Sequence, residues 1–220
     1  MSLKNNFEDL KKELPSHVTL AAVSKTHTAE KILELYELGQ RIFAENKVQE
    51  ILEKKDRLPS DIQWHMIGHL QSNKVKQIAP FVHTIQSVDS EKILQLISRE
   101  AEKNERTIEV LLQVKIAEED TKYGLEISET KELYLQYLQG AFPGVKVKGL
   151  MGMATLTEDE NQIAREFQFL KRLFDQLSLS VPLEVLSMGM TSDYPIAIKE
   201  GANLVRIGSA LFGNRNYPTN

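Results

Sequence analysis

Eight short runs of apolar residues recur along the chain, and a longer amphipathic stretch separates each run from the next. The runs are close to continuously apolar, as strands of a parallel sheet are when helices cover both faces. We therefore predict eight strands, at Val18–Ser24, Ile42–Glu45, Ile62–Ile67, His83–Ser87, Ile108–Val114, Val145–Met151, Leu183–Ser187 and Leu204–Ile207.

The stretches between these runs carry apolar residues three and four positions apart, the period of a helix with one buried face. The clearest example has Ile163, Phe167, Leu170, Phe174 and Leu177. Strict alternation of strand and helix permits a closed barrel or an open doubly wound sheet. Eight units favour the barrel, and 220 residues lie toward the small end of the barrel range of about 200 to over 400. We predict an α/β fold, with one (β/α)₈ barrel domain spanning residues 1–220.

The first fourteen residues, MSLKNNFEDLKKEL, predict an amphipathic helix that is an addition to the barrel, placed at its bottom. They contain no apolar core of a signal peptide, and no run of 18 apolar residues occurs in the chain. The net charge of −4 argues against a nucleic-acid-binding protein, which usually has a basic stripe. With no cysteine there are no disulfides or thiolate sites. We expect a cytoplasmic, monomeric protein.

The functional groups of such barrels lie at the C-terminal ends of the strands, and phosphate often binds after strands seven and eight. The runs ending at Ser187 and Ile207 are each followed closely by glycine, with serine nearby, so backbone N–H and hydroxyl groups can approach an anion there. Lys25 closes the first run, on the rim that faces this anion site. A desolvated lysine amine can form an imine with a carbonyl. An aldehyde that carries a phosphate, such as pyridoxal 5′-phosphate (PLP), meets both requirements.

This pattern does not choose the lysine. Lys115 follows the fifth run in the same way, and a class I aldolase with Lys115 as its Schiff-base residue stays open. A solvated position at a strand end explains either lysine equally well. The segment Met151–Met153 has two equal interpretations, as a closely packed turn or as a neighbour of the cofactor.

Two other polar groups receive simpler interpretations. Lys54 and Lys55 are expected to be a solvated helix end. His65 and His69 are four positions apart, but in an extended strand they would stand about 13 Å from each other, so we predict no metal site there.

Seven ordered motifs identify a resemblance that covers nearly the whole chain. They are Ala22–Thr26, Phe43–Asn46 with Val48–Glu50, Trp64–Lys74, Lys122–Gly124, Gly149–Met151, Leu186–Asp193 and Val205–Ser209. With these motifs the sequence resembles the pyridoxal phosphate homeostasis proteins. It departs from the family at His69, where proline is frequent, and at Ala44, where glycine is frequent. Neither position is a proposed cofactor contact.

The resemblance implies a PLP barrel of fold type III, similar to the N-terminal domain of alanine racemase. It implies that Lys25, and not Lys115, holds PLP as a Schiff base. Asn46 is implied beside the cofactor ring and Arg206 at the pyridine nitrogen, with contact between Arg206 and the phosphate as the alternative. The phosphate cradle is implied at Ser187, Gly208 and Ser209. The complete set of expected cofactor-binding residues is Lys25, Asn46, Met153, Ser187, Met188, Gly189, Arg206, Gly208 and Ser209.

The resemblance also implies a function in PLP homeostasis, as a carrier that supplies PLP to apo-enzymes without robust catalysis. The alternative is an amino-acid racemase. Racemases of this fold take a second base, a tyrosine, and an extra β-domain. This sequence ends at Asn220, soon after the eighth unit, so we expect the second base to be missing.

Overall fold

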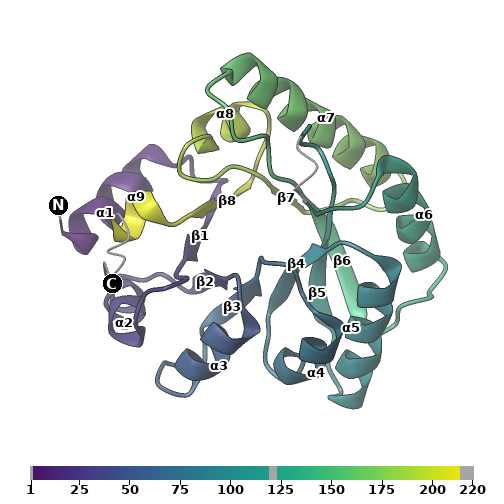
Figure 1. Ribbon diagram of the computed structural model, residues 1–220, viewed down its shortest axis with the longest axis horizontal. Coiled ribbons are helices and arrows are strands. Elements are labelled where there is room, and N and C mark those ends of the chain that lie inside the picture. The colour runs from purple at the N-terminus through teal and green to yellow at the C-terminus, as the bar shows by residue number, and fades with distance from the viewer. Residues whose placement is uncertain (1, 119–122, 214–220) are drawn as a thin grey trace, which may run out of the picture.

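The computed structural model describes residues 2–118 and 123–213. Within these residues the strands are all parallel and close into a barrel in which every strand pairs with its neighbours in chain order, as Figure 1 shows. The predicted (β/α)₈ barrel is confirmed. Its strands are β1 (Thr19–Val23), β2 (Ile42–Glu45), β3 (Gln63–Met66), β4 (Thr84–Val88), β5 (Ile108–Gln113), β6 (Val145–Met151), β7 (Val185–Ser187) and β8 (Leu204–Ile207).

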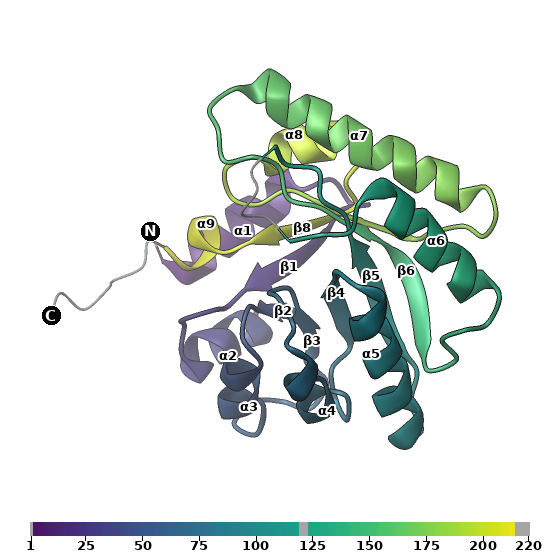
Figure 2. The ribbon, with the colours of Figure 1, turned by 45° about the vertical axis from the view of Figure 1, so that its right-hand side comes forward.

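A helix follows each strand and lies on the outside of the barrel (Figure 2). The long helices begin where a side chain can accept from the first free N–H groups, as Ser90 and Asp159 do. The helices are α1 (Leu3–Glu13), α2 (Ala29–Glu37), α3 (Val48–Lys55), α4 (Val75–Ile78) after the 3₁₀ turn η1 (Ser72–Lys74), α5 (Glu91–Lys103), α6 (Ile127–Leu138), α7 (Glu160–Ser178), α8 (Tyr194–Lys199) and α9 (Ser209–Phe212). None of the helices in these ranges is both long and apolar enough to cross a membrane.

The apolar core has two unequal parts. The larger part lies between strands and helices and includes fully buried Phe43 and Phe167. A small separate cluster forms around Ala21, Ala44 and Leu204. These belong to alternate positions of their strands, so the small cluster occupies the inside of the barrel. Small side chains there leave space for the buried polar residues described below.

Helix α1 does not cover the bottom of the barrel, so that expectation is wrong. It packs beside α9 and α2, and both ribbon views show α1 next to α9 (Figures 1 and 2). Asn6 Nδ2 donates to the Leu211 carbonyl at 3.0 Å, and the Tyr194 hydroxyl donates to Glu13 at 2.7 Å. The apolar face of α1, with buried Phe7, requires an apolar partner, which the buried side chains of α9 provide.

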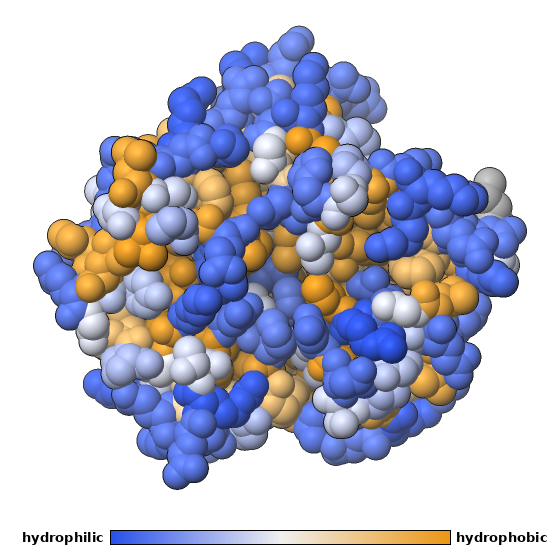
Figure 3. Space-filling view, turned by 180° about the vertical axis from the view of Figure 1, so that it is seen from behind, coloured by the Kyte–Doolittle hydropathy of each residue, from blue (hydrophilic) through white to orange (hydrophobic). Residues whose placement is uncertain are grey.

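The bottom of the barrel is polar instead. A pocket of about 260 Å³ lies there between the first residues of the strands. Lys148 forms ion pairs with Glu184 and with Glu109, the latter at 3.6 Å. Figure 3 shows the molecule from the side opposite to that of Figure 1. This face has a hollow at its centre, and the side chains inside the hollow are hydrophilic. An apolar helix face would desolvate these charges without replacing their interactions.

Candidate functional site

A pocket of about 350 Å³ opens at the C-terminal ends of the strands. Strands β1, β2, β3 and β8 and the loops after β6 and β7 supply its walls. It is lined by Val23, Lys25, Asn46, Ile67, Met153, Met190, Thr191, Ser192, Arg206, Gly208 and Ser209. Six of the nine predicted site residues are therefore brought together here: Lys25, Asn46, Met153, Arg206, Gly208 and Ser209.

The loops after β7 and β8 meet on one side of this pocket. Thr191 Oγ1 accepts a hydrogen bond from the Ala210 N–H at 3.4 Å, and the Arg206 N–H donates to the Gly189 carbonyl at 3.0 Å. The loops contribute the hydroxyls of Thr191, Ser192 and Ser209 to the lining. The described lining residues include two cationic side chains and no carboxylate, so the pocket is chemically suited to an anion.

Arg206 is a charged residue of this pocket whose side chain is held in place by hydrogen bonds. Its side chain is buried, one guanidinium nitrogen donates to Ser187 Oγ at 2.6 Å, and the other donates to the Gly152 carbonyl at 2.9 Å. Burial lowers the pKa of Arg206 to about 10, against a smaller opposing effect of the Asp193 carboxylate. The guanidinium therefore stays protonated at neutral pH.

Three of the predicted residues do not line the pocket: Ser187, Met188 and Gly189. The Ser187 hydroxyl accepts from Arg206 and donates to Gln86 Oε1 at 2.6 Å, so its hydrogen is already used. Met188 is fully buried in the larger core. Gly189 has φ +94°, and a Cβ there would lie 2.6 Å from that of Ala197, so this position is a tight turn.

Sequence reasoning missed the residues just beyond this turn. Met190, Thr191 and Ser192 supply the lining that was expected from Ser187 to Gly189. They belong to the motif Leu186–Asp193, and two adjacent hydroxyl residues after a glycine were the available signal. The turn at Gly189 is what carries the chain past the strand end and places those residues at the pocket.

A chain of buried hydrogen bonds continues from Arg206 into the barrel. Beyond Ser187, the side-chain amide of Gln86 donates from Nε2 to His65 Nδ1 at 2.8 Å. His65 must therefore be neutral with its proton on Nε2. Burial, aided by His83, lowers the pKa of His65 to about 3. The Nε2 atom has no hydrogen-bond partner among the described residues.

The two candidate lysines are separated by the structure. Lys25 lines the pocket, whereas Lys115 does not. The Lys115 N–H donates to the Leu125 carbonyl at 3.0 Å. This is a backbone hydrogen bond between the segment that follows β5 and the segment that precedes α6. Lys122, in one of the sequence motifs, lies outside the described residues.

Lys54 is not solvated, so the interpretation of a solvated helix end is wrong for this residue. Its side chain is 9% exposed and forms an ion pair with the fully buried Glu45. The amphipathic period of α3 places Lys54 on the face that packs against the barrel, three and six positions after Ile51 and Val48. The charge of Lys54 did not indicate whether its side chain is exposed, because its partner carboxylate, Glu45, comes from strand β2 and not from the same helix.

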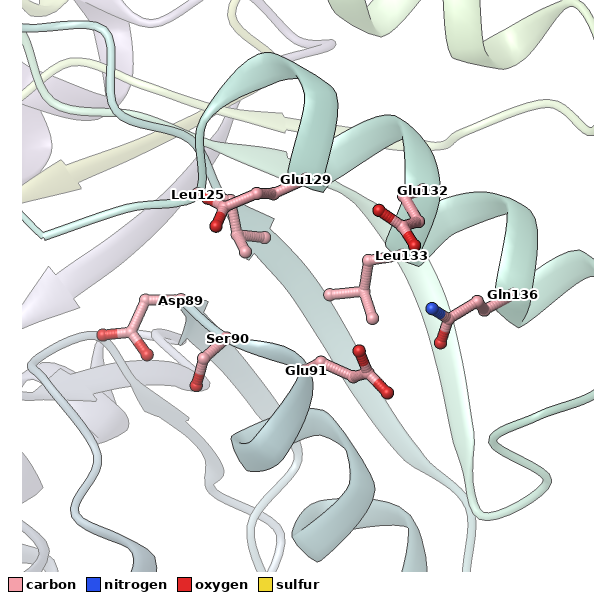
Figure 4. Close-up of a pocket in the computed structure, with 8 residues that line it drawn as sticks. All are labelled: Asp89, Ser90, Glu91, Leu125, Glu129, Glu132, Leu133 and Gln136. Atoms are coloured by element: carbon pink, nitrogen blue, oxygen red, sulfur yellow. The ribbon is translucent and has the colours of Figure 1, made fainter.

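Another pocket, of about 210 Å³, lies between the first turn of α5 and helix α6 (Figure 4). Its lining includes Asp89, Glu91, Glu129 and Glu132 but, among the described residues, no lysine or arginine. It therefore repels an anion and offers no amine for an imine. The described residues also contain no group of three or more histidine, aspartate or glutamate residues that could hold a metal ion.

Comparison with known proteins places this chain in a family. The family described as "Alanine racemase, N-terminal domain" matches residues 1–216. A protein of Aquifex aeolicus named "Pyridoxal phosphate homeostasis protein" is 41% identical over 201 residues, which cover 90% of this chain and 87% of the relative. A protein of Schizosaccharomyces pombe with the same name is 40% identical, over 90% of this chain and 85% of the relative. The chain belongs to the pyridoxal phosphate homeostasis protein family.

Solved structures agree with this membership. PipY of Synechococcus elongatus, in a structure without PLP, is 35% identical with a TM-score of 0.89 over 96% of this homeostasis-family chain and 100% of its own. A second PipY structure, with PLP bound, is 34% identical with a TM-score of 0.86 and the same coverage. Alanine racemase of Clostridium difficile has a TM-score of 0.79 at 16% identity, over 99% of this chain and 57% of its own, which is a likeness of fold.

Proposed function

We propose that this protein binds PLP in the pocket at the C-terminal ends of the strands and serves as a PLP carrier in cofactor homeostasis. The observation that carries the proposal is the pocket itself. It combines one lysine, one buried arginine and three hydroxyls, and its described lining contains no carboxylate. This combination suits an aldehyde that carries a phosphate group. The names of the relatives and the PLP-bound PipY structure support the same ligand.

In this proposal Lys25 Nζ holds the cofactor through an imine. The phosphate lies against the loops after β7 and β8, where Thr191, Ser192, Gly208 and Ser209 offer hydroxyl and backbone donors. Asn46 and Met153 lie beside the ring. Ser187, whose hydroxyl is engaged with Gln86 and Arg206, holds Arg206 in place and does not touch the phosphate.

Arg206 is proposed to face the pyridine nitrogen. PLP supplies an aldehyde for covalent attachment and a ring that can accept electrons. A guanidinium that stays protonated cannot give its proton to the ring nitrogen, so it keeps the ring a weak electron sink. Such a ring tolerates a brief carbanion, as racemisation requires, but disfavours the transaminase-type chemistry that uses a carboxylate partner at the ring nitrogen.

The first test concerns Lys25. Purified protein with PLP is expected to be yellow, and borohydride is expected to fix the cofactor on one peptide that contains Lys25. Lys25→Ala should abolish the label and leave some PLP held through its phosphate, whereas Lys115→Ala should behave as the unchanged protein. Mass spectrometry of the reduced digest decides. A label on Lys115, or none at all, would overturn the assignment.

The second test separates the carrier from a racemase. The PLP-loaded protein is incubated with single enantiomers of several amino acids, and the appearance of the other enantiomer is followed by chiral chromatography. The carrier proposal predicts no turnover at ordinary enzymatic rates. Turnover of about 1 s⁻¹ or faster, lost in Lys25→Ala, would replace it with the racemase.

A further inference from the structure

A buried ionic cluster lies immediately behind the pocket, in the layer between the barrel wall and α3. It consists of Lys54 and Glu50 from α3 and Glu45 from the end of β2. Lys54 Nζ is 2.8 Å from Glu45 Oε1 and 3.2 Å from Glu50 Oε2. The Lys54 side chain is 9% exposed, Glu45 is fully buried and the Glu50 side chain is 20% exposed. None of the three lines the pocket.

The cluster makes hydrogen bonds to both sequence neighbours of Lys25. Before Lys25, the Ser24 hydroxyl donates to Glu45 Oε1 at 2.7 Å, and the Ser24 carbonyl accepts from Lys54 Nζ at 3.1 Å. After Lys25, the Thr26 N–H donates to Glu50 Oε2 at 2.6 Å. The backbone that carries Lys25 is therefore held on both sides by one connected set of charges.

The backbone needs this support at Thr26. Thr26 has φ +68°, a left-handed conformation that is unusual for a residue other than glycine. Threonine is also β-branched, which makes this conformation less favourable still. Such strain persists only where the surroundings impose it. Two hydrogen bonds hold it here: the His27 N–H closes a turn on the Ser24 carbonyl at 3.0 Å, and the Thr26 N–H donates to the Glu50 side chain.

Stability alone is a poor explanation for the cluster. Burying a charged pair costs desolvation energy that the attraction between the charges repays only in part. Glu45 Oε2 has no hydrogen-bond partner among the described residues, and burial raises the pKa of Glu45 to about 7 in spite of the attraction of Lys54. An apolar contact between α3 and β2 would dock the helix with less desolvation. Unlike an apolar contact, the charged groups also fix the backbone on either side of Lys25 through hydrogen bonds.

We propose that Lys54, Glu45 and Glu50 are positioning residues that fix the Ser24–Lys25–Thr26 backbone and so determine how readily the Lys25 amine forms its imine with PLP. The proposal rests on the proposed function. It assigns the cluster an effect on the covalent step, while the loops after β7 and β8 provide phosphate binding independently.

The experiment compares Lys54→Met with Lys148→Met. Lys148 is a matched control, because its side chain is 13% exposed and paired with two glutamates, but at the opposite end of the barrel. For each variant we measure the melting temperature without PLP, the total PLP bound at saturation, the rate at which the visible imine band grows, and the fraction of bound PLP that borohydride fixes on Lys25.

Both variants are expected to melt at lower temperature. Only Lys54→Met should slow imine formation, by about ten-fold or more, and lower the fixed fraction while total PLP binding is largely kept. Lys54→Arg should restore part of the rate, because an arginine can keep the contacts to both glutamates. If Lys54→Met does not fold, Glu50→Ala replaces it: this change removes the acceptor of the Thr26 N–H and leaves the Glu45–Lys54 pair in place.

The outcomes are distinguishable. If the unchanged protein itself shows no label on Lys25, the proposed function is wrong. If the unchanged protein is labelled and the folded Lys54 or Glu50 variants form the imine at the same rate, the cluster only stabilises the fold and the positioning proposal is overturned. Equal slowing in Lys148→Met would overturn it as well, because the effect would then follow from general destabilisation.

Discussion

Arg206 and Ser187 act as one unit in this structure. The Ser187 hydroxyl is the acceptor for one guanidinium nitrogen and is itself oriented by Gln86. A hydroxyl can donate only one hydrogen, so donation to Gln86 leaves its oxygen turned to Arg206. Loss of the serine must therefore loosen the arginine before it affects any ligand.

This coupling makes a spectroscopic prediction. Arg206→Gln should change the absorbance maximum or the pH dependence of bound PLP, and Ser187→Ala should change it in the same direction but less. A hydrogen bond to a charged group is worth roughly 1.5–3 kcal/mol, so Ser187→Ala should also destabilise the protein by about that amount. Visible spectra and denaturant unfolding of both variants provide the measurement.

Ser98→Ala is the control for this pair. Ser98 is buried and its hydroxyl accepts from the Gly144 N–H at 3.0 Å, away from the pocket. It should lower stability without any spectral change. If Ser187→Ala instead weakens PLP binding about ten-fold with an unaltered spectrum, the hydroxyl contacts the phosphate after all. An unaltered spectrum in Arg206→Gln would count against contact between Arg206 and the ring.

At the level of the elements, the end of β3 is packed directly against the end of β2. A Cβ on Gly68 would lie 2.2 Å from the Asn46 carbonyl oxygen and 2.8 Å from Asn46 Cα. Both of these are backbone atoms, which cannot move aside as a flexible side chain can. The absence of a side chain at Gly68 is thus a condition for the position of Asn46, a lining residue of the pocket.

Gly68→Ala should therefore affect both stability and PLP affinity. Overpacking typically costs about 1–3 kcal/mol, and here the strain falls on the backbone of a pocket residue. Gly39→Ala is the matched control: Gly39 has φ +98° with nothing within 4 Å of a Cβ, so its replacement should cost about 1–2 kcal/mol without changing PLP affinity. Unfolding in urea and PLP titrations test both, and an unchanged affinity in Gly68→Ala would contradict the argument.

The strands and the pocket rim were predictable because each depends on local sequence. Runs such as Val18–Ser24 are apolar whatever surrounds them, and the C-terminal rim of a barrel follows once the strands are counted. The burial of Lys54 and the position of α1 were not predictable in this way. The burial of Lys54 depends on Glu45, which comes from another element, and the site of α1 depends on apolar residues of α9 at the other end of the chain. The position of Ser187 behind the pocket was not predictable for a third reason: its hydroxyl donates to Gln86, which is 101 residues away in the sequence.

At the level of the whole molecule, the buried polar chain from Arg206 through Ser187 and Gln86 to His65 runs through the interior of the barrel. It joins the pocket at one end to the polar pocket at the other, because His65 also lines the latter. The chain requires His65 to be neutral, since Nδ1 must accept from Gln86. A proton added to Nδ1 would remove that acceptor and place a charge in a buried position.

Two buried groups consequently give the protein opposing pH responses. The pKa of His65 is lowered from 6.5 to about 3, so between these values the unfolded chain binds more protons and stability falls as the pH falls. The pKa of Glu45 is raised from 4.5 to about 7, so between these values the folded chain binds more protons and stability rises as the pH falls. The two effects oppose each other from pH 6.5 to 4.5, so in this range they partly cancel in the unchanged protein.

Replacing His65 should reveal its contribution to the pH dependence of stability. His65→Gln keeps an acceptor for Gln86 and does not titrate. A pH of 4.5 is two units below the pKa of this histidine in the unfolded chain. Protonation of the unfolded chain therefore lowers the free energy of unfolding by about 2.7 kcal/mol, and the variant lacks this destabilisation. The difference in unfolding free energy between His65→Gln and the unchanged protein should therefore shift by about this amount in favour of the variant between pH 7.5 and 4.5, measured by urea denaturation at each pH. A pH-independent difference for His65→Gln would mean that His65 accepts a proton in the folded barrel, and that the polar chain does not depend on its neutral form.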